Sequence, residues 1–205
     1  MHIREIIAGG KPLEEAAKAL IMLHGRGATA KDILPLSDAF DLKDFTIIAP
    51  QATNKIWYPN SFLSPPRQNE PWLSSALQII ASIEIDLNDH GIQSGDIYLF
   101  GFSQGACLAL EYATRNAKLY GGIAALSGGL IGDVLYYGNY KGNFRNTPVY
   151  IGCSDPDPHI PLERVNITAG LMKKMHANVK VDIYREMGHT IIEDEINTVN
   201  QMIFS

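Results

Sequence analysis

The chain has 205 residues, of which 46% are hydrophobic and 19% are charged, and its formal net charge is −5. This size and composition fit one compact, soluble domain spanning residues 1–205. The acidic balance, without any lysine- or arginine-rich block, argues against a nucleic-acid partner and against stable membrane association. No apolar run approaches the roughly 18 residues of a spanning helix, and the N-terminus lacks the order of a secretory signal.

Short apolar runs predict strands at 19–23, 45–51, 96–102, 120–128, 147–154 and 179–187. Amphipathic stretches predict helices at 29–40, 72–91, 103–117, 161–178 and 191–204. Thr29 is expected to cap the first helix. Buried strands that alternate with helices predict an α/β fold, in which a mostly parallel central sheet carries helices on both faces. Two irregular stretches, 53–71 and 128–147, are candidate pocket walls.

The segment Gly101-Phe102-Ser103-Gln104-Gly105 fits the G-x-S-x-G nucleophile elbow. An apolar strand precedes it and a helix follows it, which is the context this motif requires. The glycines allow the serine to sit on a sharp turn with its hydroxyl exposed above the sheet. We therefore expect Ser103 to be a nucleophile rather than part of an ordinary strand–helix turn.

A nucleophilic serine needs a base and an acid that orients it, and the elbow class places them in the order serine, acid, histidine. His189 follows the last predicted strand and is the candidate base. The acid should follow the preceding strand, where Asp155 and Asp157 both stand next to proline. Sequence spacing does not separate these two aspartates, because either one could instead form the turn that leaves the strand.

An oxyanion hole requires two N–H donors. The main-chain N–H of Gln104, directly after the nucleophile, is one candidate. The other is the main-chain N–H of Arg26 in the loop "LHGRGA". The less favoured alternative is that the Arg26 guanidinium binds an acidic substrate. His24 is expected to brace this loop by hydrogen bonds.

Four aromatic residues lie in or beside the first irregular stretch: Trp57, Tyr58, Phe62 and Trp72. Such rings can wall an acyl or aryl pocket, or they can simply anchor the loop to the surface. Trp57 and Tyr58 are taken as substrate-binding candidates. His159, two residues beyond Asp157, is a candidate for the pocket rim.

Cys107 and Cys153 lie far apart and in no C-x-x-C spacing, so we predict reduced thiols in a cytoplasmic protein. The chain has no G-x-G-x-x-G, P-loop or H-E-x-x-H motif, and we expect neither a metal nor an organic cofactor. The oligomeric state stays open, a homodimer included.

The segments "LHGRGA", "GFSQGACLAL", "IGCSDPDPHIP" and "EMGHT" together resemble the phospholipase/carboxylesterase family of α/β-hydrolases, which includes acyl-protein thioesterases. The resemblance implies an α/β-hydrolase fold without a separate cap domain, and a serine esterase without metal or cofactor. Its D-x-x-x-P pattern selects Asp157, through Pro161, as the acid. Counting forward from Gly152 would select Asp155. The family often has a second glycine where this chain has Ala106.

These observations predict a hydrolase that cleaves small carboxylic esters with short to medium acyl chains. Ser103 attacks the carbonyl, His189 transfers the proton and Asp157 orients the imidazole. The alternatives are a thioesterase or lysophospholipase of the same family, an amide or peptide hydrolase, and a non-catalytic binding protein with this fold.

Overall fold

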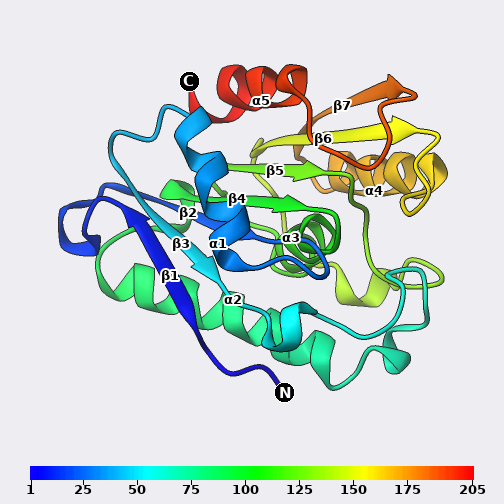
Figure 1. The fold of residues 1–205 in the computed structure, drawn as a ribbon, viewed down its shortest axis with the longest axis horizontal. Coiled ribbons are helices and arrows are strands. Elements are labelled where there is room, and N and C mark those ends of the chain that lie inside the picture. The colour runs from blue at the N-terminus through cyan, green and yellow to red at the C-terminus, as the bar shows by residue number, and fades with distance from the viewer.

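The computed structural model describes residues 1–205 and contains one seven-stranded sheet in the order β1-β3-β2-β4-β5-β6-β7 (Figure 1). The strands are β1 (Ile6–Gly10), β2 (Lys18–Leu23), β3 (Phe45–Pro50), β4 (Ile97–Phe102), β5 (Gly122–Leu126), β6 (Pro148–Asp155) and β7 (Asn178–Arg185). Strand β1 is antiparallel to β3, and all the other neighbouring strands are parallel. The carboxyl ends of β4 to β7 therefore meet at one edge of the sheet, where sites in α/β proteins form.

The principal helices are α1 (Ala30–Ile33), α2 (Trp72–Asp89), α3 (Gln104–Arg115), α4 (Leu162–Lys174) and α5 (Glu193–Val199). Helices α2, α3 and α4 pack on one face of the sheet, and α1 and α5 on the other. Strand β2 shows how one apolar run serves both faces: Ala19 and Ile21 contact the first group, whereas Leu20 and Met22 contact the second. Continuous apolar runs, rather than alternating ones, are what a sheet covered on both faces requires.

The structure differs from the sequence prediction at three elements. Strand β1 was not expected. The predicted helix 29–40 begins as α1 but continues as a 3-10 helix, Leu34–Ala39, where Pro35 lacks an N–H donor. The last predicted helix begins only at α5 and ends in a π-helical turn, Asn200–Phe204.

The two irregular stretches contain only short 3-10 helices, namely Thr53–Lys55, Pro66–Gln68 and Tyr137–Asn139. Buried Glu111 anchors the second stretch by accepting a hydrogen bond from the N–H of Ile131 at 3.0 Å. The Arg164 guanidinium anchors it further by donating to the carbonyls of Leu130, Gly132 and Asp133. None of the helices combines the length and the apolar character needed to cross a membrane.

Candidate active site

Ser103 stands at the turn between β4 and α3 with φ 55° and ψ −118°. Such positive-φ geometry is uncommon for a residue with a side chain and costs on the order of 1–3 kcal/mol. The N–H of Ser103 donates to the carbonyl of Leu126 on β5 at 2.9 Å, and its carbonyl accepts from Cys107 at 3.0 Å. The first turn of α3 and the neighbouring strand thus hold the serine in its strained conformation.

Glycines on both sides of Ser103 permit this turn because other backbone atoms approach them closely. A Cβ at Gly105 would lie 2.1 Å from the carbonyl oxygen of Leu23, and one at Gly101 would lie 2.4 Å from that of Gly105. Ala106 fits where a second glycine is often expected because Gly128 faces it. A Cβ at Gly128 would lie 2.6 Å from the Ala106 Cβ.

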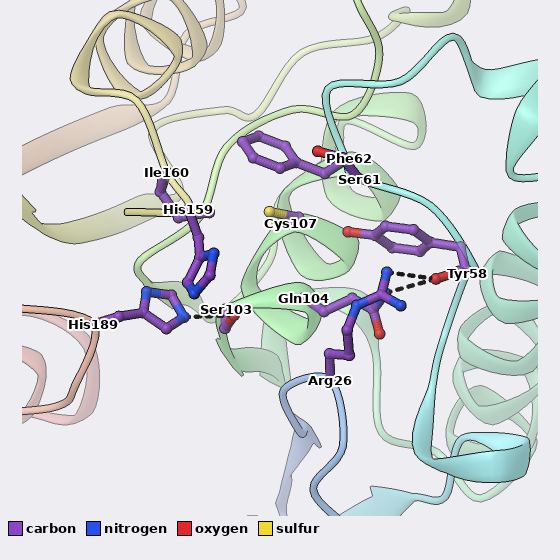
Figure 2. A pocket seen from close by; sticks show the side chains of 10 residues that line it. All are labelled: Arg26, Tyr58, Ser61, Phe62, Ser103, Gln104, Cys107, His159, Ile160 and His189. Atoms are coloured by element: carbon purple, nitrogen blue, oxygen red, sulfur yellow. Dashed lines mark hydrogen bonds between the residues drawn. The ribbon is translucent and has the colours of Figure 1, made fainter. Parts of the chain in front are cut away.

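His189 lies in the loop after β7, and its Nε2 is 2.7 Å from the Ser103 Oγ (Figure 2). Two rings contact the imidazole. The centroid of Phe102 is 5.1 Å away, and that of His159 is 4.8 Å away in an edge-on arrangement. These contacts restrict the rotation of the imidazole and aim Nε2 at the serine hydroxyl.

Asp157 is the aspartate that reaches His189, with 2.9 Å between its Oδ2 and the imidazole Nδ1. Its Oδ1 accepts hydrogen bonds from the N–H groups of His159 and Ile160 at 2.8 and 3.0 Å. Asp155, in contrast, ends β6 in an exposed position.

The protonation pattern follows from these contacts. Burial alone would raise the pKa of Asp157, but the hydrogen bonds from His189, His159 and Ile160 outweigh it and hold the pKa below the usual value. The ionised carboxylate can only accept, so the proton of the neutral imidazole sits on Nδ1. Nε2 of His189 is then free to accept the proton of Ser103.

Among the main-chain N–H groups near Ser103 that have no acceptor in the protein are those of Arg26 and Gln104. Gln104 begins α3, so its N–H has no intrahelical partner. The loop that carries Arg26 approaches the serine closely, since a Cβ at Gly25 would lie 3.5 Å from the Ser103 Cβ. Both groups are thus available to a ligand beside the serine hydroxyl.

The side chains of the same two residues hold the segment 57–60. Gln104 accepts from the N–H of Trp57 at 2.9 Å and donates to the carbonyl of Tyr58 at 2.8 Å. The Arg26 guanidinium donates to the carbonyls of Tyr58, Pro59 and Asn60 at 2.8, 2.9 and 2.7 Å. Figure 2 shows the Arg26 side chain turned toward the carbonyl oxygen of Tyr58. The guanidinium therefore braces the pocket wall.

His24 is fully buried and braces the loop after β2, as expected. Its Nδ1 donates to the carbonyl of Gly25 at 2.7 Å, and its Nε2 accepts from the N–H of Ala52 at 3.1 Å. Burial lowers its pKa, which fits an imidazole that must be neutral to accept at Nε2.

Trp57 was expected to bind substrate, but the structure does not bring it to the pocket. It is 0% exposed, and its indole N–H donates to the carbonyl of His24 at 2.9 Å. The ring packs against His24 with 5.0 Å between centroids. Its hydrogen-bonding edge and its face are both used inside the protein, so Trp57 supports the loop from within.

A cavity of about 350 Å³ opens beside the serine. It is lined by Arg26, Tyr58, Ser61, Phe62, Ser103, Gln104, Cys107, His159, Ile160 and His189 (Figure 2). Two of the sequence candidates for substrate binding, Tyr58 and His159, are thus at the cavity. Burial raises the pKa of the Cys107 thiol to about 12, which keeps it protonated and unreactive. No cluster of three or more His, Cys, Asp or Glu side chains forms a metal site.

Sequence reasoning missed several contributors. Phe102 occupies a free position of the G-x-S-x-G motif, yet its ring packs on His189. The side chain of Gln104 was not expected to pair with the loop at Trp57 and Tyr58. Phe62 was noted among the aromatics but not chosen as a binding residue. Long-range contacts of this kind leave no periodic signal in the chain.

A mostly parallel sheet with a strained serine at a strand–helix turn, and with an acid and a histidine from later loops at the same edge, defines an α/β-hydrolase. The family model described as Phospholipase/Carboxylesterase matches residues 2–204, and the chain belongs to this family of ester hydrolases. The resemblance seen in the four sequence segments is confirmed.

Solved structures of similar proteins have the same fold. The phospholipase/carboxylesterase from Dyadobacter fermentans is 49% identical, with a TM-score of 0.98, and the match covers 100% of this chain and 98% of that one. The Bacillus cereus carboxylesterase has a TM-score of 0.78 at 17% identity, covering 97% and 92% of the two chains, and shows the same fold.

Curated relatives are acyl-protein thioesterases. The acyl-protein thioesterase 1 of Kluyveromyces lactis is 27% identical over 214 residues, covering 93% of this chain and 92% of that protein. That of Gibberella zeae is 32% identical over 117 residues, covering 56% of this chain and 50% of that protein. Several of these matches thus span only about half the length of the relative.

Proposed function

We propose that this protein hydrolyses carboxylic esters with short to medium acyl chains through a covalent acyl-enzyme on Ser103. The observation that carries the proposal is the continuous chain of hydrogen bonds from Ser103 through His189 to Asp157, with distances of 2.7 and 2.9 Å. A serine hydroxyl is a weak nucleophile until a base accepts its proton. Here the base is within hydrogen-bond reach, and a carboxylate fixes its tautomer.

In the first half of the reaction, the Ser103 Oγ attacks the ester carbonyl while His189 Nε2 takes the hydroxyl proton. Asp157 stabilises the imidazolium that forms, without being protonated itself. The C–O bond of the leaving alcohol then breaks, and His189 returns the proton to that alcohol. In the second half, His189 deprotonates a water molecule, which attacks the acyl carbonyl. The bond between the acyl carbon and the Ser103 Oγ then breaks, and His189 returns the proton to that oxygen, which releases the acid and free Ser103.

The main-chain N–H groups of Arg26 and Gln104 are proposed as the oxyanion hole. Both lack acceptors in the protein, and that of Gln104 lies at the positive end of the α3 helix dipole. Donors fixed in advance favour the negative charge that develops on the carbonyl oxygen in the transition state. Each such donor contributes about 3–4 kcal/mol in a serine hydrolase.

The size and lining of the cavity support small esters. Its volume of about 350 Å³ is at the low end of the range for small-molecule sites. Tyr58, Phe62 and Ile160 offer apolar surface, whereas Ser61 and Arg26 add polar groups. We propose that the acyl group lies against the Tyr58 and Phe62 rings.

Substitution of Ser103 tests the proposal. Ser103→Ala should keep the fold, and its rate of p-nitrophenyl ester hydrolysis should fall by several orders of magnitude. Removal of the triad nucleophile abolishes nearly all of the catalytic activity. A fluorophosphonate should label the wild type at Ser103, as read by peptide mass spectrometry. An active alanine variant, or label on another serine, would contradict the mechanism.

Thioester hydrolysis is the second candidate, because the curated relatives are named acyl-protein thioesterases. Matched oxygen esters and thioesters of acetyl to octanoyl groups separate the two activities. A kcat/KM that is consistently higher for the thioesters would favour this second function. It would leave the roles of Ser103, His189 and Asp157 unchanged.

A further inference from the structure

One buried hydroxyl joins the loop that carries Asp157 to the loop that carries His189. The Oγ of Ser154 donates a hydrogen bond to the carbonyl of Pro156 at 3.1 Å and accepts one from the N–H of Gly188 at 3.0 Å. Pro156 directly precedes the acid, and Gly188 directly precedes the histidine. Ser154 thus contacts the residue before each of the two groups whose mutual geometry the reaction needs.

This link lies where the sheet no longer holds the two loops together. Strands β6 and β7 are paired as far as Asp155 and Arg185, and a last backbone bond runs from Glu186 to Asp155 at 3.3 Å. Past that bond, two hydrogen bonds hold the His189 loop: one from the N–H of Gly188 to Ser154 of β6, and one between His189 and Asp157. Without the first, the second would be the sole polar contact that sets the spacing of the loops.

Ser154 is suited to this task because it is buried and held within the sheet. It is 0% exposed and lies within β6, in register with Tyr184 of β7. A hydroxyl can donate and accept at once, so it satisfies a carbonyl on one loop and an N–H on the other. An alanine here would leave the carbonyl and the N–H without partners.

We infer that Ser154 is a positioning residue for the reaction, which sets the distance between the Asp157 and His189 loops through its two hydrogen bonds. The inference rests on the proposed function of Ser103, His189 and Asp157. Its consequence is specific: loss of the hydroxyl loosens the Asp157–His189 bond and misaims Nε2 of the imidazole, while Ser154 itself does not line the substrate cavity.

The test uses two substitutions that remove the hydroxyl but fill the space differently. Ser154→Ala leaves a small void, whereas Ser154→Cys fills the site with a slightly larger thiol that bonds only weakly. Both should lower kcat for p-nitrophenyl acetate by about 10- to 100-fold, since a small misplacement of reacting groups has effects of this size. KM should change little, because neither substitution touches the cavity.

Ser127→Ala is the matched control. Ser127 directly follows the neighbouring strand β5, is also 0% exposed, and has a hydroxyl without any partner. This variant should keep the wild-type kcat. Proton NMR adds a readout independent of turnover: the downfield signal of the His189 Nδ1 proton should broaden or move in the two Ser154 variants, and it should stay in Ser127→Ala.

The outcomes separate the positioning role of Ser154 from the proposed mechanism on Ser103. Wild-type kcat in both Ser154 variants, with Ser103→Ala inactive, would overturn the role of Ser154 and leave the proposed function standing. Full activity in Ser154→Cys beside a loss in Ser154→Ala would show a packing effect, which also overturns it. Retained activity in Ser103→Ala would instead refute the mechanism itself. Should Ser154→Ala fail to fold, Ser154→Cys alone decides.

Discussion

The Asp157 carboxylate accepts three hydrogen bonds, from His189, His159 and Ile160, whereas the Asp155 carboxylate accepts none. Asp157→Asn should therefore lower kcat for ester hydrolysis by a factor on the order of 10⁴, because an amide stabilises the wrong imidazole tautomer. Asp155→Asn should leave kcat near that of the wild type, since its side chain is exposed at the end of β6. Steady-state kinetics with thermal unfolding as a folding check would measure both. A folded but inactive Asp155→Asn would reverse the assignment.

At this scale, the sequence predicted residues whose roles depend on order along the chain. Ser103 and His189 were expected from the motif and its serine–acid–histidine order, and the D-x-x-x-P pattern favoured Asp157. The failure was Trp57. Its residue type and its place in a loop suggested a pocket wall. Which of the adjacent Trp57 and Tyr58 rings faces the cavity, however, depends on partners such as the His24 carbonyl. Those partners come from a distant loop, and composition does not reveal them.

At the scale of elements, one segment, 57–60, connects the loop after β2 to the start of α3. Gln104 and Arg26 each offer a main-chain N–H beside Ser103 and a side chain to this segment. The pocket wall and the proposed oxyanion donors are thus parts of one hydrogen-bonded unit. A change in either side chain should affect substrate binding even though both N–H groups remain.

Two variants of Gln104 test this coupling. Gln104→Ala should lower the free energy of unfolding by about 1–3 kcal/mol, because the buried N–H of Trp57 loses its acceptor. It should also raise KM for p-nitrophenyl butyrate. Gln104→Glu should be at least as harmful, because a carboxylate can accept from Trp57 but faces the carbonyl of Tyr58 instead of donating to it. Urea unfolding and ester kinetics would measure both effects, and unchanged KM in the two variants would disprove the coupling.

The predicted elements show the same division between local and distant causes. The buried parallel strands were recognised because continuous apolar runs are required when helices cover both faces. Strand β1 was missed because its sequence IIAGG is short, half-exposed and rich in glycine, and it is paired at one side only. The break between α1 and its 3-10 continuation is caused by Pro35. This proline was visible in the sequence but was not weighed against the amphipathic pattern.

At the scale of the whole molecule, both faces of the sheet bury carboxyl groups, but these differ in how they are satisfied. On the face covered by α2, α3 and α4, both oxygens of buried Glu84 and Glu111 accept hydrogen bonds. Under α5, on the other face, Glu195 is 0% exposed. Its Oε2 accepts from the N–H of Ile192 at 3.1 Å, and its Oε1 has no partner. The carboxyl group lies against Gly152 of β6, where any Cβ would be 2.1 Å from Oε1.

This buried carboxyl should make the stability of the fold depend on pH. Burial, with a contribution from the charge of Asp182, raises the pKa of Glu195 from 4.5 to about 7, although the hydrogen bond from Ile192 opposes the shift. Between these two values the folded chain binds more protons at this site than the unfolded chain. The free energy of unfolding should therefore fall as pH rises through this window, by an amount on the order of 3 kcal/mol at most.

Glu195→Gln isolates this contribution. The amide is neutral at every pH, and its oxygen can still accept from Ile192. The variant should gain stability relative to the wild type as pH rises from 5 to 8, because only the wild type must keep a buried charge at high pH. Urea unfolding of both proteins at several pH values measures the difference. The histidines and the other carboxylates titrate in both chains, so they cancel in that difference. A difference that stays flat across the range would show that Glu195 is not the group whose buried charge penalises the fold.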